Sequence, residues 1–115
     1  MAKWNAAVDF QGPTISIIKS STGRLFGGFL SQNLTGANTW YVDANAFLFS
    51  LDNLVRLNLK NPADGNAFYS GASSGPWFGA SYDLQVVNNA NASTGSYTQL
   101  GYTYQLPAGI TYNTV

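Results

Sequence analysis

Residues 14–30, TISIIKSSTGRLFGGFL, give the clearest indication of secondary structure in this chain. The segment 14–19 is rich in β-branched residues, and it is followed by a Ser-Ser-Thr-Gly turn at 20–23. An apolar stretch returns over residues 24–30. β-Branched and aromatic segments joined by turn residues predict an antiparallel hairpin. Gly27 and Gly28 in the returning strand predict a bulge or a close approach of another part of the backbone.

Short strand-like segments continue along the chain, separated by turn residues about every ten positions, a spacing typical of β-sandwiches and barrels. Residues 45–51 are apolar on both faces, which predicts a central strand covered on each side. Further strands are predicted at 55–60, 67–70, 84–87, 97–106 and 110–115, and residues 71–79 are predicted to form a glycine-rich loop. No long stretch has the 3.6-residue period of a helix. The sequence therefore predicts an all-β fold with little or no helix.

The side chains that are absent restrict the chemistry. The chain contains no His, Cys or Glu, and its acidic residues are five aspartates. This excludes the commonest general base, thiol nucleophiles and the usual transition-metal ligands. Two aspartates could serve a glycosidase, and Asp with Asn could hold calcium, but no pair is singled out by spacing and no D-x-D-x-D-G loop is present. We therefore expect no enzyme activity, no cofactor and no metal.

Charge is low and evenly divided. Charged residues make up 9% of the chain, with five basic and five acidic side chains and a net charge of zero. The basic residues are scattered, so no nucleic-acid partner is predicted. No apolar run approaches the roughly 20 residues that span a bilayer, so no membrane insertion is expected. We expect a soluble protein, favour an extracellular over a cytoplasmic location, and note that zero net charge promotes self-association.

Four segments, in order, resemble the TLDc family. They are WNAAVDFQGPT at 4–14, RLFGGFLS at 24–31, DANAFLFSL at 43–51 and GPWFG with YDL between 75 and 84. The resemblance implies one TLDc-like domain over residues 1–115, built as a two-sheet antiparallel β-sandwich. It also implies no established enzyme chemistry, and roles in oxidative-stress protection or in binding the vacuolar proton pump.

The chain departs from the family at its ends and at one aromatic residue. TLDc domains usually begin further upstream and end with a further strand that carries a glutamate. A missing last strand would leave an open sheet edge, and this predicts a homo-oligomer formed by edge pairing or strand donation. Trp77 stands where the family has a small polar residue.

Two segments combine aromatic rings with polar side chains and are candidate ligand-binding sites. The candidate residues are Trp40, Tyr41, Asp43, Asn45, Trp77, Tyr82 and Asp83. Aromatic faces cover the apolar side of a pyranose, and carboxylates and amides bind its hydroxyls, so carbohydrate is the favoured ligand and a protein surface the alternative. The same residues also have a structural interpretation, in which Trp40 packs on the core and Asp43 and Asn45 fix a turn. The resulting hypotheses are a lectin-like binding module, a structural subunit of an extracellular assembly or filament, and a TLDc-type stress or pump-regulating protein.

Overall fold

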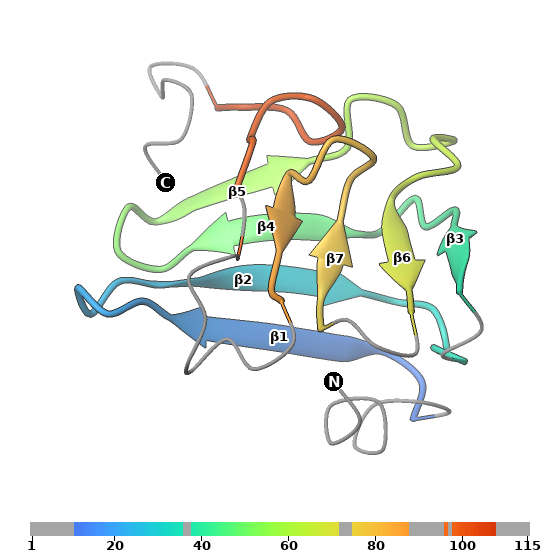
Figure 1. Cartoon of the computed structure of the whole chain (residues 1–115). Helices are drawn as coiled ribbons and strands as arrows, with labels where there is room; N and C mark the ends of the chain where they lie inside the picture. Colours follow the sequence, from blue (N-terminus) through green and yellow to red (C-terminus); the bar gives the residue numbers. More distant parts are fainter. Residues whose placement is uncertain (1–10, 36–37, 72–74, 88–95, 97, 108–115) are drawn as a thin grey trace.

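A computed structural model describes residues 11–35, 38–71, 75–87, 96 and 98–107. Its strands are β1 (Thr14–Lys19), β2 (Leu25–Leu30), β3 (Thr39–Tyr41), β4 (Phe47–Ser50), β5 (Val55–Asn58), β6 (Phe68–Ser70), β7 (Trp77–Phe78) and β8 (Leu84–Gln85). They form two four-stranded antiparallel sheets with the orders β1-β2-β4-β5 and β3-β6-β7-β8. Figure 1 shows the second sheet lying across the front of the first. The predicted two-sheet β-sandwich is confirmed, and no helix occurs in these described ranges.

The hairpin at the start of the chain has the predicted strands and turn. Ser20 donates its N–H to the Arg24 carbonyl at 2.9 Å, and Gly23 donates to the Ser20 carbonyl at 3.0 Å. Gly23 has a φ of 86°, the left-handed conformation that such a turn requires of one residue. Each residue of β1 has a partner in β2, so the bulge considered for Gly27 and Gly28 is absent.

Close approach, the other possibility for these glycines, is what the structure shows at Gly28. A Cβ atom at this position would lie 2.5 Å from Cζ of Phe78, which belongs to the opposite sheet. The Phe78 ring is 1% exposed, and its centroid lies 4.8 Å from the ring of Phe68 and 6.1 Å from that of Tyr104. The two sheets therefore meet where the ring of β7 rests on bare backbone of β2.

Alternation along the strands builds the remaining core. Leu48 and Ser50 of β4 are buried, whereas Phe47 and Phe49 face the outer side and are half-buried. The prediction that 45–51 is covered on both faces is wrong for the described residues, since no third layer lies over that outer side. Phe47 is covered instead by side chains of neighbouring strands, stacking on Phe29 at 5.2 Å and lying 3.8 Å from the Arg56 guanidinium.

Two other predicted segments differ from the structure. Residues 71–79 were expected to form a loop, but Trp77 and Phe78 form β7, because Phe78 pairs with Phe68 of β6. Residues 97–106 were expected to form a strand, but within the described residues they contain only an isolated bridge between Tyr104 and Leu59. Residues 110–115 and the first part of the 4–14 segment lie outside the described residues.

Gly28→Ala should lower the free energy of unfolding by about 1–3 kcal/mol, the usual cost of overpacking a core. The enclosed ring of Phe78 has no space into which it could move away from an added methyl group. Gly65→Ala is the matched control, because an added Cβ at Gly65 meets nothing within 4 Å. Urea unfolding of both variants measures the difference, and equal effects would contradict this packing.

Candidate functional site

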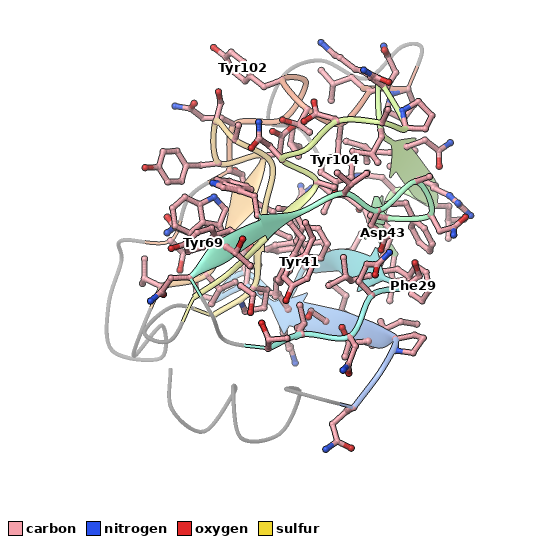
Figure 2. The ribbon with its side chains drawn as sticks, turned by 90° about the vertical axis from the view of Figure 1, so that its right-hand side faces the viewer. Phe29, Tyr41, Asp43, Tyr69, Tyr102 and Tyr104 are labelled. Atoms are coloured by element: carbon pink, nitrogen blue, oxygen red, sulfur yellow. The ribbon has the colours of Figure 1, made fainter. Side chains whose placement is uncertain are left out.

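The outer face of the second sheet carries a row of aromatic side chains. Trp40 of β3 lies opposite Tyr69 of β6, and Trp77 of β7 lies opposite Gln85 of β8. The pairing of Phe68 with Phe78 places Tyr69 next to Trp77. Neighbours in these strands point inward, because successive side chains in a strand alternate between the two faces. Figure 2 shows Tyr69 on the outer side of this sheet and Tyr41 on the side that faces β1 and β2.

We call Trp40, Tyr69, Trp77 and Tyr82 the aromatic platform. Ring centroids are separated by 5.1 Å between Trp40 and Tyr69, 4.7 Å between Tyr69 and Trp77, and 5.5 Å between Trp40 and Trp77. Tyr82 stacks on Trp77 at 5.1 Å with an interplanar angle of 16°. The indole N–H of Trp77 donates to the Gly79 carbonyl at 3.2 Å. The first three rings are half-buried and Tyr82 is 39% exposed, so the platform forms a continuous apolar surface that solvent reaches.

A tight turn holds Tyr82 in place. Its N–H donates to the Gly79 carbonyl, and its own carbonyl accepts the N–H of Gln99 at 2.8 Å. Tyr82 has a φ of 61°, a left-handed conformation that is unusual for a residue with a bulky side chain. Such backbone strain persists only where the surroundings enforce it, and it is often found at binding sites.

A polar hollow adjoins the platform at Tyr82. It is open to solvent, has a volume of about 510 Å³, and is lined by Ala80, Ser81, Tyr82, Gln85 and Gln99. The two amides and two hydroxyls can each donate and accept hydrogen bonds. No charged side chain is among the lining residues. The platform and the hollow therefore combine apolar rings with uncharged hydrogen-bonding groups on one surface.

Asp83 anchors the chain segment that supports this turn. Its carboxylate is fully buried and accepts the backbone N–H of Thr103 at 3.0 Å and that of Tyr104 at 3.0 Å. The Thr103 hydroxyl in turn accepts the N–H of Ala80 at 3.2 Å. Gly79, with a φ of 85°, leaves space for the carboxylate, since a Cβ there would lie 2.2 Å from Asp83 Oδ1. Through these contacts Asp83 holds the turn at residues 79–82 against the segment that contains Thr103 and Tyr104.

Of the seven residues predicted to bind a ligand, the structure brings together Trp40, Trp77 and Tyr82. Tyr41 faces the core, and its hydroxyl lies 2.8 Å from the Thr35 hydroxyl. Asp43 is 1% exposed. Its carboxylate accepts the N–H and the hydroxyl of Ser31, both at 2.6 Å, and the N–H of Asn45 at 3.0 Å.

These contacts correspond to the structural interpretation of Asp43, which fixes the turn that leads into β4. Asp43 and Asp83 are therefore not part of the candidate site, because backbone and hydroxyl groups of the protein already occupy their oxygens. Asn45 is exposed, but it lines neither the platform nor the hollow.

Sequence reasoning missed four residues of the site. Tyr69 and Gln85 could have been found from alternation, since each follows a buried residue in a short predicted strand. Ser81 and Gln99 carry no such signal, because loop geometry brings them to the hollow.

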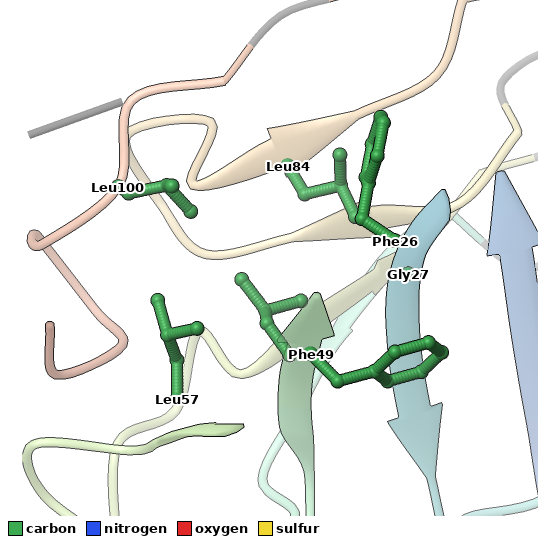
Figure 3. Close-up of a pocket in the computed structure, with 7 residues that line it drawn as sticks. Phe26, Gly27, Phe49, Leu57, Leu84 and Leu100 are labelled. Carbon is green, nitrogen blue, oxygen red and sulfur yellow. The ribbon is translucent and has the colours of Figure 1, made fainter. Parts of the chain in front are cut away.

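A second gap lies between the sheets and is not a ligand site. Figure 3 shows Leu57, Leu84 and Leu100 directed into it, and its volume is about 30 Å³. Its walls are almost entirely apolar, so it offers a water molecule no hydrogen-bond partners.

The described residues offer neither a metal site nor a membrane-spanning helix. No group of three or more potential metal ligands is found there. The described strands and loops also include no helix long and apolar enough to cross a membrane.

Comparison with known proteins gives one result. The family model described as "TLDc domain" matches residues 4–113, nearly the whole chain. No match was found among curated proteins or among solved structures.

The stability of the fold should depend on the ionisation of Asp83. Burial raises its pKa above the ordinary value of 3.8, although the N–H groups of Tyr104 and Thr103 act in the opposite direction. Relative to the unfolded chain, the folded protein therefore binds the proton of Asp83 more tightly. The contribution of Asp83 to stability is complete below pH 3.8 and is lost as the pH rises through the raised pKa.

Asp83→Asn removes this titration and leaves the other aspartates unchanged. The free energy of unfolding of the unchanged protein, minus that of the variant, should fall as the pH rises from 3.8 toward neutrality. Urea unfolding at a series of pH values measures this difference. A difference that stays constant or increases with pH would contradict the effect of burial.

Proposed function

This chain belongs to the TLDc domain family, and we propose that it is a non-catalytic binding module whose aromatic platform binds an uncharged carbohydrate. The observation that carries the proposal is the continuous surface from Trp40 across Tyr69 and Trp77 to Tyr82, with the polar hollow at its end. The absence of His, Cys and Glu from the sequence supports a role without catalysis.

The arrangement suits a sugar because a pyranose has an apolar face and a polar rim. Aromatic side chains supply large, rigid apolar area at a low cost in conformational entropy. Gln85 and Gln99 could bind hydroxyl groups from the side of the hollow, where Tyr82 also presents its ring. The volume of about 510 Å³ lies within the usual range for small-molecule sites and is enough for one or two sugar rings.

The site favours an uncharged ligand over an acidic one. No Lys or Arg is among the residues that line the hollow, and the carboxylates of Asp43 and Asp83 are occupied within the fold. The carboxylate of a uronic or sialic acid would therefore lose hydration on binding without gaining a positively charged partner. Such uncompensated desolvation of a charge costs free energy.

A glycan array with neutral and acidic members tests the proposal, and fluorescence titration of the tryptophans then measures affinity. We expect binding to neutral glycans, and Tyr82→Ala and Gln85→Ala should each weaken it about tenfold, a loss of roughly 1.4 kcal/mol. Tyr102→Ala is the matched control, because Tyr102 is 56% exposed and lies outside the lining of the hollow and the platform.

An array on which no neutral glycan is bound would refute the carbohydrate proposal. Equal losses in the Tyr82 and Tyr102 variants would show that the ligand binds elsewhere.

The family supports a second candidate function. The family model extends over residues 4–113. We therefore also propose the roles that the TLDc resemblance implies, which are oxidative-stress protection or regulation of the vacuolar proton pump. Co-purification of pump subunits with the tagged chain would favour this role. The same platform would then contact a protein surface, and Tyr82→Ala should reduce the recovery of those subunits whereas Tyr102→Ala should not.

A further inference from the structure

β1 forms an edge of its sheet that no other described strand covers. The described part of the sandwich has four edge strands, of which β1 has six residues, β5 four, β3 three and β8 two. The end of β5 and the residues after it are covered, because Gln105 donates to the Asn58 carbonyl and Lys60 donates to the Thr103 carbonyl. Among the described residues, β1 pairs only with β2, and Figure 1 shows it at the border of its sheet. Long open edges are sites where another strand can add.

The hairpin turn establishes which backbone groups face this open edge. Ser20 donates to the Arg24 carbonyl, one position beyond the pair formed by Lys19 and Leu25. Hydrogen-bonded pairs recur at every second residue of an antiparallel ladder, so the even-numbered residues of β1 bind β2. The odd-numbered residues, Ile15, Ile17 and Lys19, therefore direct their N–H and carbonyl groups outward.

The side chains of the same residues form an apolar surface. Ile15 is 62% exposed and Ile17 is 63% exposed, and both point to the outer face of the first sheet. An edge that combines free backbone groups with exposed β-branched side chains can gain both ladder hydrogen bonds and cross-strand packing from one partner. Natural edges are usually protected by charged side chains, especially Lys, or by Pro. β1 has Lys19 at its end and Pro13 before its start, whereas residues 14–18 between them include neither a charge nor a proline.

We propose that two copies of this chain pair through their β1 edges, antiparallel about a two-fold axis at Ser16, to form one continuous eight-stranded sheet. In this register Ile15 of each copy lies opposite Ile17 of the other, and each such pair exchanges two backbone hydrogen bonds. Lys19 then lies opposite Pro13, so no like charges face each other. The zero net charge of the chain adds no general repulsion between the copies.

Neighbouring registers are less favourable. Shifting the axis to Ile17 pairs Lys19 with Ile15 and retains a single contact between isoleucines. Shifting it to Ile15 pairs Ile17 with Pro13, which has no N–H to donate. The missing hydrogen bond then falls at an isoleucine pair, whereas in the proposed register it falls at Lys19, at the end of the strand. The two isoleucines are spaced so that β1 is complementary to a second copy of itself. This spacing therefore favours a second copy as the partner and specifies the register of the pairing.

Sedimentation velocity over chain concentrations up to about 500 µM tests the proposal, because an interface of this size is expected to be weak. The unchanged chain should form dimers, and Ile17→Lys should raise the dissociation constant about tenfold or more by placing an unpaired charge in the interface. Leu54→Lys is the matched control, since Leu54 is 88% exposed at the turn between β4 and β5. A monomer at every concentration, or equal effects of the two substitutions, would overturn the proposal.

Cysteine cross-linking tests the register, and the chain has no cysteine of its own to interfere. When Ile15→Cys and Ile17→Cys variants are mixed and oxidised, the mixed disulfide should exceed its statistical share. In the proposed register position 15 of one copy faces position 17 of the other, with Cα atoms about 5.5 Å apart, which is within the reach of a disulfide. Position 17 of one copy is offset by two residues along the strand from position 17 of the other. Preferential cross-linking of the Ile17→Cys variant with itself would overturn the proposed register.

Discussion

The contact between Phe78 and Gly28 is the constraint on which the rest of the sandwich depends. Two sheets pack about 10 Å apart. Here the ring of Phe78 reaches the backbone of β2, because Gly28 has no side chain to hold it away. Phe78 uses this space and also contacts Phe68 and Tyr104, whose hydroxyl donates to the Ala67 carbonyl at 2.6 Å. One inward ring thereby joins β2, β6 and the segment after residue 98. The position of Phe78 fixes that of Trp77, because adjacent residues in a strand face opposite sides.

Those parts of the fold that depend on local pattern could be predicted from the sequence. The first hairpin was predicted with its strands and its turn, since alternation and turn residues act over a few positions. β7 was missed because two residues in a glycine-rich segment have no period of their own. They become a strand only through pairing with β6 and β8, which lie elsewhere in the sequence. In the strand predicted at 97–106, alternation would place Tyr102 and Tyr104 on the same face. In the structure Tyr102 is exposed and Tyr104 is fully buried.

Three of the four platform residues were predicted from the sequence, whereas Tyr69 and the residues that line the hollow beside Tyr82 were not. Trp40, Trp77 and Tyr82 were identified by residue type, and the register places them together. Sequence alone leaves the roles of Asp43 and Asp83 open, because a carboxylate beside an aromatic residue has the same pattern whether it faces a ligand or the backbone. The partners that decide this for Asp83 lie 20 and 21 positions away, at Thr103 and Tyr104. Only the tertiary structure shows that its oxygens are already occupied.

In β7, Phe78 packs in the core and the adjacent platform residue Trp77 lies on the opposite face. Gly28, Asp43, Phe78, Gly79 and Asp83 all lie within the matching segments, and each holds the two sheets or a loop in position. Trp77, by contrast, points outward beside Phe78 and contributes to the platform. A change at the outward position alters the surface without changing the inward ring, so the core can stay constant while the surface varies. The family therefore explains the fold of this chain, and its ligand must be inferred from the platform residues themselves.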